Sequence, residues 1–261
     1  MIGKILLRGM LAGLLAGILC FCFLKTFGEG PVDRAIAFET QMEAAKAQSD
    51  ASRTADAPKP APMVMPEPEL VSRATQSGLG LFTGVVVYAS AFGGLFALGF
   101  AFLYRRWGNL SAQATALLLA IGGFVAVYVV PSLKYPANPP SVGEAETIKI
   151  RTTLYFAMIV ISLISLYGAA LLRNRLQPRL GLWNAAILAG LAYIVAMLVV
   201  GMATPSVNEV PEGFPANVLW QFRVASFGAQ MLMWLAIGLI FGGLTQRAER
   251  LAAEPAKLKA A

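Results

Sequence analysis

Long apolar stretches alternate with polar turns and loops along the whole chain. A window of about 19 residues finds six such stretches. They cover residues 5–24 (interrupted by Arg8), 79–103, 112–131, 152–172, 182–203 and 224–244. Each is long enough to cross a hydrocarbon core about 30 Å thick as a helix, and open sheets cannot pair their backbone groups in lipid. The pattern predicts an all-α fold, a polytopic helical membrane bundle with six transmembrane helices.

Composition agrees with this pattern and narrows the chemistry. Of the 261 residues, 57% are apolar and 13% are charged, whereas a soluble domain carries about 25% charged residues. The lipid bilayer is therefore the expected partner of most of the surface. The chain contains no histidine, and it has no phosphate-binding loop, nucleophile elbow or paired-cysteine motif. We expect neither an enzyme nor a bound cofactor.

The charged residues divide unequally between the two sets of connections. If the N-terminus is cytoplasmic, the connections on its side are rich in cations and are opposed only by Glu249 and Glu254. This positive-inside pattern explains the net charge of +7 without a nucleic-acid partner. We predict that both termini are cytoplasmic and that the inner cations contact anionic lipid headgroups. These cations are Lys4, Arg8, Arg105, Arg106, Arg173, Arg175, Arg179, Arg247, Arg250, Lys257 and Lys259.

The first apolar stretch and the long loop after it need separate treatment. Lys4 and Arg8 precede an apolar run, as in a cleaved signal, but the run is long and lacks a small-x-small cleavage site, which favours an uncleaved helix. Residues 31–48 predict a short amphipathic helix that Asp33 can cap. Residues 49–70 are proline-rich and predict an extended tether in the outer loop. Residues 1–261 otherwise form a single integral membrane domain.

Two repeated patterns concern the packing of the helices. Arg73, Arg151 and Arg223 each precede a returning helix, which is explained either by three related helical hairpins or by a preference of the outer interface for arginine. Glycines four residues apart permit close helix contact in lipid. They serve either packing within the chain or docking of a partner helix. These glycines are Gly9, Gly13 and Gly17, then Gly80 and Gly84, then Gly238 and Gly242.

The outer loops hold the side chains that fit a metal ion. Carboxylate and amide oxygens are ligands for divalent metals, and an oxygen-rich mouth concentrates cations through its local field. The alternative is that these groups are solvated charges or helix caps. The candidate metal residues are Glu29, Asp33, Glu39, Glu144, Glu146, Asn208, Glu209 and Glu212.

The spans themselves contain almost no ionisable group, which argues against a self-contained ion-coupled transporter. Asn184 and Gln230 are the best candidates for a polar path through them.

Two sulfur pairs are weaker candidates for a metal site. Met63 and Met65 lie in the tether as a pair of weak thioether ligands. Cys20 and Cys22 lie about 200° apart around a helix, so they are poorly placed to chelate one ion.

Several stretches together resemble the CbtA family of cobalt transporter subunits. The most specific are the loop strings at 134–140 (KYPANPP) and 208–215 (NEVPEGFP), and further stretches lie at 7–13, 28–36, 80–85 and 131–133. The resemblance covers almost the whole chain except the tether. It implies cobalt(II) uptake across the bacterial inner membrane, linked to cobalamin biosynthesis, by a multi-pass subunit. It also implies a small one-span partner, CbtB, with a histidine-rich end.

The chain departs from the family pattern in two ways. Family members often carry histidines in the first outer loop, and this chain has none. The family is described with five spans, whereas six are predicted here, and cleavage of the first segment would restore five. The alternative function is a non-transporting membrane scaffold that docks a partner through its glycine-rich helix faces. The identity of the ion, the energy coupling and homo-oligomer formation stay open.

Overall fold

Helices make up most of the chain that the computed structural model describes, namely residues 2–54, 71–106, 109–143 and 145–258. No strand occurs within these residues, and the predicted all-α fold is confirmed. Five helical segments of the described chain are long and apolar enough to cross a membrane. They are Ile2–Ser49, Arg73–Leu103, Ala112–Lys134, Glu146–Ala203 and Ala216–Ala253. The fold is therefore that of a helical membrane bundle.

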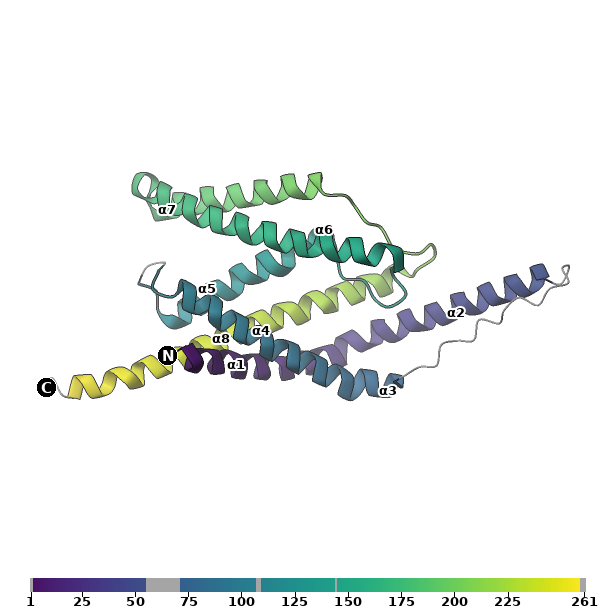
Figure 1. The fold of residues 1–261 in the computed structure, drawn as a ribbon, viewed down its shortest axis with the longest axis horizontal. Coiled ribbons are helices and arrows are strands. Elements are labelled where there is room, and N and C mark those ends of the chain that lie inside the picture. Colours follow the sequence, from purple (N-terminus) through teal and green to yellow (C-terminus); the bar gives the residue numbers. More distant parts are fainter. Residues whose placement is uncertain (1, 55–70, 107–108, 144, 259–261) are drawn as a thin grey trace.

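Several helical elements follow one another without a break, and we call each such continuous run a rod. The first rod is longer than the sequence pattern predicts. Helix α1 (Ile2–Phe23) continues through a π-helical turn, η1 (Leu24–Gly28), into α2 (Glu29–Thr54) without a break. The π-helical turn ends at Gly28, three residues before Pro31, whose missing N–H would interrupt a regular helix. Figure 1 shows α2 projecting beyond the other helices. Residues 49–54 of the predicted tether are thus helical, while 55–70, with Met63 and Met65, lie outside the described residues.

Two further rods begin with side-chain caps. The second consists of α3 (Arg73–Thr75), η2 (Gln76–Gly80) and α4 (Leu81–Leu103), and the Ser72 hydroxyl caps it by accepting from the Thr75 amide. The third consists of α5 (Ala112–Gly123), η3 (Phe124–Val129) and α6 (Val130–Lys134). The Ser111 hydroxyl caps it through the Ala114 amide at 3.2 Å. The π-helical turn η3 again leads into a proline, Pro131.

Helix α7 (Ala145–Ala203) contains two of the predicted spans in one element. It turns back on itself at Gly181, whose φ of 76° and ψ of 169° are open essentially only to glycine. Figure 1 shows the two arms side by side, and Ser162 and Tyr193 join them with their hydroxyl oxygens 2.7 Å apart. The predicted spans 152–172 and 182–203 therefore lie in different arms. The last helix, α8 (Ala216–Leu258), extends beyond the predicted span 224–244 at both ends.

The core is built where glycines let helices touch. A Cβ on Gly13 of α1 would lie 2.1 Å from the Ala89 carbonyl oxygen of α4, and one on Gly93 would lie 2.2 Å from the Gly9 oxygen. A Cβ on Gly238 of α8 would lie 2.6 Å from the Ala120 Cβ of α5. The prediction of close packing is confirmed for these faces. They are occupied within the chain, so a partner helix would need another surface.

Aromatic side chains fill the space beside these contacts. Trp234 of α8 packs edge-on against Phe92 of α4, and Phe241 packs edge-on against both Phe96 and Phe100. The phenyl rings of Phe100 and Phe241 are fully buried. The core therefore joins α1, α4, α5 and α8, and the α7 hairpin lies beside it.

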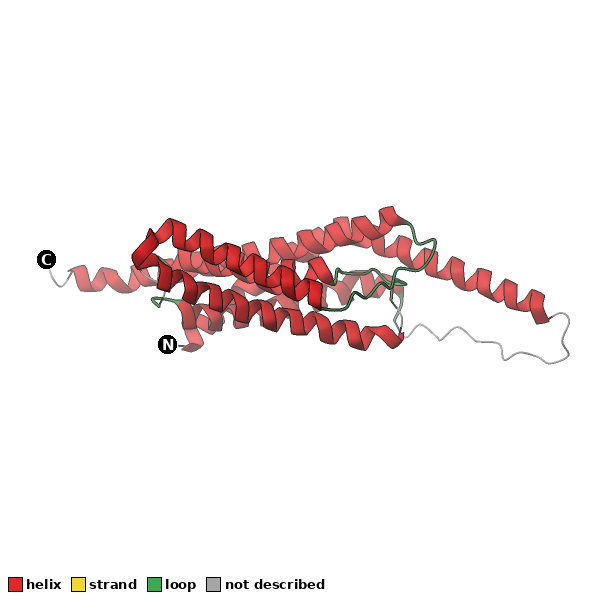
Figure 2. Ribbon diagram, turned by 90° about the horizontal axis from the view of Figure 1, so that it is seen from above, coloured by secondary structure: helices red, strands yellow, loops and turns green. Residues whose placement is uncertain are grey.

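The two ends of the bundle differ in what they contain. Both termini, the turn after α4 and the bend of α7 lie at one end, here called the terminal end (Figures 1 and 2). The connections 135–143 and 204–215 lie at the other, here called the loop end. At the terminal end the Tyr104 hydroxyl donates to Glu249 Oε2 at 2.9 Å. Burial of the hydroxyl raises the pKa of Tyr104, and the hydrogen bond to Glu249 raises it further. This contact ties the end of α4 to the extension of α8.

Candidate functional site

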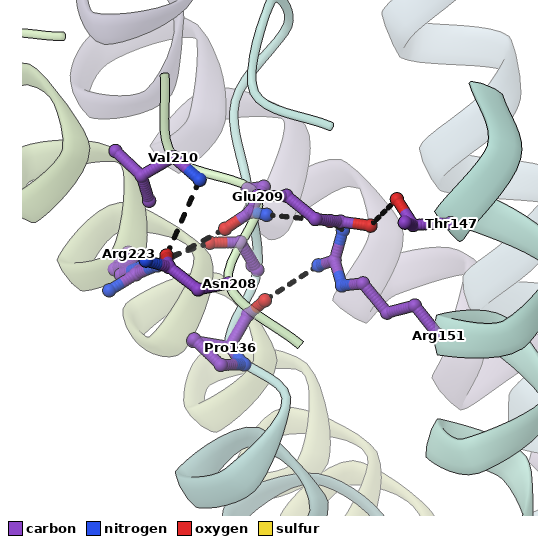
Figure 3. Close-up of polar contacts among 9 residues, drawn as sticks. Pro136, Thr147, Arg151, Asn208, Glu209, Val210 and Arg223 are labelled. Carbon is purple, nitrogen blue, oxygen red and sulfur yellow. Dashed lines mark hydrogen bonds and ion pairs between the residues drawn. The ribbon is translucent and has the colours of Figure 1, made fainter. Parts of the chain in front are cut away.

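Glu209 is the centre of the polar contacts at the loop end (Figure 3). Its side chain is only 2% exposed and forms an ion pair with Arg151 Nη1 at 3.0 Å. The Thr147 hydroxyl donates to Oε1 at 2.5 Å, and the Asn138 amide donates to Oε2 at 3.3 Å. A buried charge is tolerated when it is paired and hydrogen-bonded in this way. These residues, together with Arg223, form what we call the Glu209 cluster.

Two arginines of this cluster fix the loop that carries Asn138. Arg151 Nη2 donates to the Pro136 carbonyl oxygen at 2.7 Å. Arg223 Nε donates to the Ala137 oxygen at 3.3 Å, and Arg223 Nη2 donates to Asn138 Oδ1 at 3.1 Å. The Tyr135 hydroxyl donates to the Pro205 oxygen at 2.8 Å and joins this loop to the next. The starts of α7 and α8 thus hold both loop-end connections in place.

The third arginine of the predicted repeat binds carboxylates of the first rod. Arg73 pairs with Glu29 at 2.5 Å and with Asp33 at 2.8 Å, which ties α3 to the start of α2. All three arginines therefore bind oxygen atoms of a loop-end segment. This shared role is compatible with both explanations of the repeat, and the relation of the three hairpins stays a prediction.

A pocket of about 370 Å³ lies beside the Glu209 cluster, between the η3–α6 segment and the first arm of α7. Aromatic rings, hydroxyl groups and one guanidinium group surround it. Its lining consists of Tyr128, Ser132, Tyr135, Pro136, Ala137, Ile148, Arg151, Thr152 and Tyr155. We call it the loop-end pocket. A smaller one, of about 180 Å³, lies beside η1 and includes Glu29.

The predicted metal residues do not form one group. Glu29 and Asp33 share Arg73, and Glu209 belongs to its own cluster. The Asn208 side-chain oxygen accepts from the Val210 amide at 3.4 Å. The remaining acids are Glu39, Glu146 and Glu212, which are exposed, and Glu144, which lies outside the described residues. Within the described ranges, no three His, Cys, Asp or Glu side chains are grouped to hold a metal ion. Their metal role stays a prediction.

The other candidates within the spans are also placed. Asn184 is exposed on the second arm of α7, and Gln230 is half-buried on α8. Cys20 is buried, with its thiol 3.5 Å from the Ala229 oxygen, whereas Cys22 is exposed. The two cysteines therefore lie on different faces, as the helical spacing predicts. Nothing in these positions tests a polar path.

Sequence reasoning missed the partners of Glu209. Arg151 was singled out only as a member of a repeat, and Asn138 only as part of a loop string. The ion pair between Arg151 and Glu209 joins residues 58 positions apart in the chain. No short-range spacing rule connects them. The one signal was that both loop strings, 134–140 and 208–215, stood out from their apolar surroundings.

These features define a class of protein. Its long apolar helices pack through glycine contacts, and its ion pairs lie at the two ends of the bundle, as expected for a multi-pass membrane protein. A family model described as "Probable cobalt transporter subunit (CbtA)" matches residues 2–246, so the chain belongs to that family. No curated protein and no solved structure matched the chain. Membership connects the bundle with membrane transport and with cobalt.

Proposed function

We propose that this chain is the integral subunit of a cobalt(II) uptake transporter in the bacterial inner membrane, linked to cobalamin biosynthesis. The observation that carries the proposal is the family match over residues 2–246. The chain has no histidine and therefore offers no imidazole nitrogen. Nitrogen ligands bind cobalt(II) more tightly than oxygen ligands do. We therefore propose that a small one-span, CbtB-like partner with a histidine-rich end supplies those ligands. This subunit supplies the passage through the membrane.

The proposed topology has six spans with both termini in the cytoplasm. Helix α7 then crosses the membrane twice, because its bend at Gly181 lies at the terminal end together with both termini. The basic residues near this bend, Arg173, Arg175 and Arg179, support a cytoplasmic position. The loop end, with the Glu209 cluster, then faces outward.

Cysteine labelling in intact cells checks this topology. In a background without Cys20 and Cys22, Glu212→Cys should react with a membrane-impermeant maleimide, because Glu212 is exposed at the loop end. Arg175→Cys should react only after the membrane is permeabilised. If Arg175→Cys is labelled in intact cells and Glu212→Cys is not, the orientation is wrong. If both are labelled, α7 does not cross twice.

The exposed acids of the loop end have a weaker proposed role than chelation. We propose that Glu39, Glu146 and Glu212 attract divalent cations toward the mouth through their field. Charges of this kind act over about 10 Å at 0.1 M salt. This long-range action does not require the carboxylates to meet at one point.

Uptake of radiolabelled cobalt should reveal this attraction. In cells that carry both subunits, Glu39→Gln, Glu146→Gln and Glu212→Gln together should lower uptake about twofold to tenfold at low ionic strength and low metal. Raising the salt concentration should remove the difference, because screening weakens the field. Arg151 and Glu209 are left intact so that the fold is preserved. Unchanged uptake at low salt would contradict the acidic-mouth proposal.

The alternative function, a non-transporting scaffold, loses its main support from the packing. The glycine faces of α1 and α8 that were to dock a partner contact other helices of this chain, whereas Gly84 is open and Gly80 approaches only Thr75 of its own helical segment. Purified chain and partner in sealed vesicles distinguish the two functions. Metal accumulation supports the transporter, and its absence together with a stable complex supports the scaffold.

A further inference from the structure

The Glu209 cluster carries more positive than negative charge. Arg151 forms an ion pair with Glu209 at 3.0 Å. Arg223 is bound only to the Ala137 oxygen and the Asn138 amide oxygen, and no carboxylate among the described residues pairs with it. The two guanidinium groups lie close enough for their charges to interact (Figure 3). One carboxylate therefore serves two neighbouring cations, and positive charge that is partly removed from water favours an anionic ligand.

The loop-end pocket lies beside this excess charge, and its lining is mostly apolar. Arg151 is the one charged side chain among the described residues that line it. Its guanidinium binds Glu209 through Nη1 and Pro136 through Nη2, and its other N–H groups make no hydrogen bond to a described residue. The hydroxyls of Tyr128 and Tyr155, on the same lining, also make none. The pocket thus offers N–H and O–H donors to an anion.

The surroundings of the pocket favour a lipid over a dissolved anion. The pocket lies at the loop end, where the helices of a membrane bundle meet the interface between lipid and water. An exposed row of side chains on the first arm of α7 begins in the pocket lining and continues toward the terminal end. Side chains four residues apart lie on one face of a helix. The row consists of Ile148, Thr152, Phe156, Val160 and Ile164, and it is apolar beyond Thr152.

We propose that the loop-end pocket binds the headgroup of an anionic phospholipid, with the phosphate at Arg151 and the acyl chains along the exposed row of α7. Basic pockets between transmembrane helices bind headgroups of this kind. A zwitterionic headgroup fits less well, because its ammonium group finds no carboxylate among the described residues of the lining. The proposal needs the membrane bundle with its loop end at an interface, and it does not depend on cobalt transport.

Native mass spectrometry of the full chain in detergent tests the site, with phosphatidylglycerol as the probe. One molecule of this lipid should bind more tightly than any further ones, and phosphatidylethanolamine should show no such first site. Thr152→Trp fills the pocket from an exposed position and should remove the tight first binding. Thr153→Trp is the matched control, because Thr153 is exposed on the same helix and does not line the pocket. Equal binding to the two variants, or equal first sites for the two lipids, overturns the proposal.

Two substitutions of Arg223 test whether the excess charge selects the lipid. Both Arg223→Gln and Arg223→Lys remove the guanidinium that holds Ala137 and Asn138, but only the glutamine variant removes the charge. Arg223→Gln should weaken the first phosphatidylglycerol site about fivefold, the effect of one basic residue at an anionic membrane surface. Arg223→Lys should leave the affinity nearly unchanged. Equal weakening in both variants would overturn the selection of this lipid by charge.

Inorganic phosphate distinguishes a lipid from a dissolved anion. Equilibrium dialysis of the chain in detergent against radiolabelled phosphate should show no binding that Thr152→Trp removes. Such binding would make the pocket a site for a free anion and overturn the lipid assignment. Phosphatidylglycerol should raise the thermal unfolding midpoint of the unchanged chain and of Thr153→Trp, but not that of Thr152→Trp. All three chains should have the same midpoint without added lipid, and an equal rise in all three would also overturn the assignment.

Discussion

Gly13→Leu should prevent the chain from folding into a stable bundle. The new Cβ would lie 2.1 Å from the Ala89 carbonyl oxygen and 2.8 Å from its carbon, and both are backbone atoms that cannot rotate away. Helices α1 and α4 must therefore separate, and their shared contacts are lost. We expect a loss of about 3 kcal/mol or more, measured as a fall in the thermal unfolding midpoint in detergent and in the yield of monodisperse protein.

Gly84→Leu is the matched control on the partner helix. Gly84 belongs to a pair with the same four-residue spacing, yet a Cβ there meets nothing within 4 Å. Its replacement should leave stability unchanged or raise it by up to about 1 kcal/mol, because leucine forms helix better than glycine. Equal damage from both substitutions would mean that α1 and α4 do not cross at Gly13.

Arg151→Ala should be the most damaging single change among the charged residues of the loop end. It leaves the Glu209 carboxylate, which is 2% exposed, without its ion-pair partner, and it releases the Pro136 carbonyl. Breaking a buried pair from one side costs about 3–5 kcal/mol. Thermal unfolding of the purified chain should show a correspondingly large drop in the midpoint.

A second variant and a control distinguish this explanation from loss of an arginine in general. Arg151→Ala with Glu209→Ala should be more stable than Arg151→Ala alone, because the unpaired buried charge is gone. Arg105→Ala breaks an exposed pair with Glu249, at 3.9 Å and with 79% of the arginine side chain exposed, and should cost at most about 1 kcal/mol. A double variant as unstable as the sum of its two single variants would exclude this role for the ion pair.

The sequence predicts the positions of the long apolar helices well because lipid enforces a simple rule. A segment in the hydrocarbon core must be apolar and internally hydrogen-bonded, so apolar length alone locates a helix. All six predicted segments fall within helical parts of the structure. The rule says nothing about where a helix stops outside the membrane. The continuity of α1 with α2 and the length of α8 were missed for this reason.

The site was less predictable, because its geometry depends on contacts that are distant in the chain. Glu209 was singled out as a candidate metal residue in a loop, but its burial results from Thr147, Arg151 and Asn138 meeting it from two other segments. Composition and spacing cannot distinguish such a residue from Glu212, three positions later, which is exposed. The glycine pattern has the same limit, since it does not show that Gly13 is covered while Gly84 is open.

The contact between the first and the last helix has a consequence for biosynthesis. Cys20 of α1 lies against Ala229 of α8, and the Phe23 ring lies where a Cβ on Gly228 would approach it to 2.7 Å. Helix α1, which leaves the ribosome first, therefore cannot complete its contacts until α8, the final helix, has been inserted into the bilayer. A nascent chain that ends before residue 216 lacks this closing contact, and it leaves bare Ala116 and Ala120 of α5, which the glycines of α8 cover in the finished bundle.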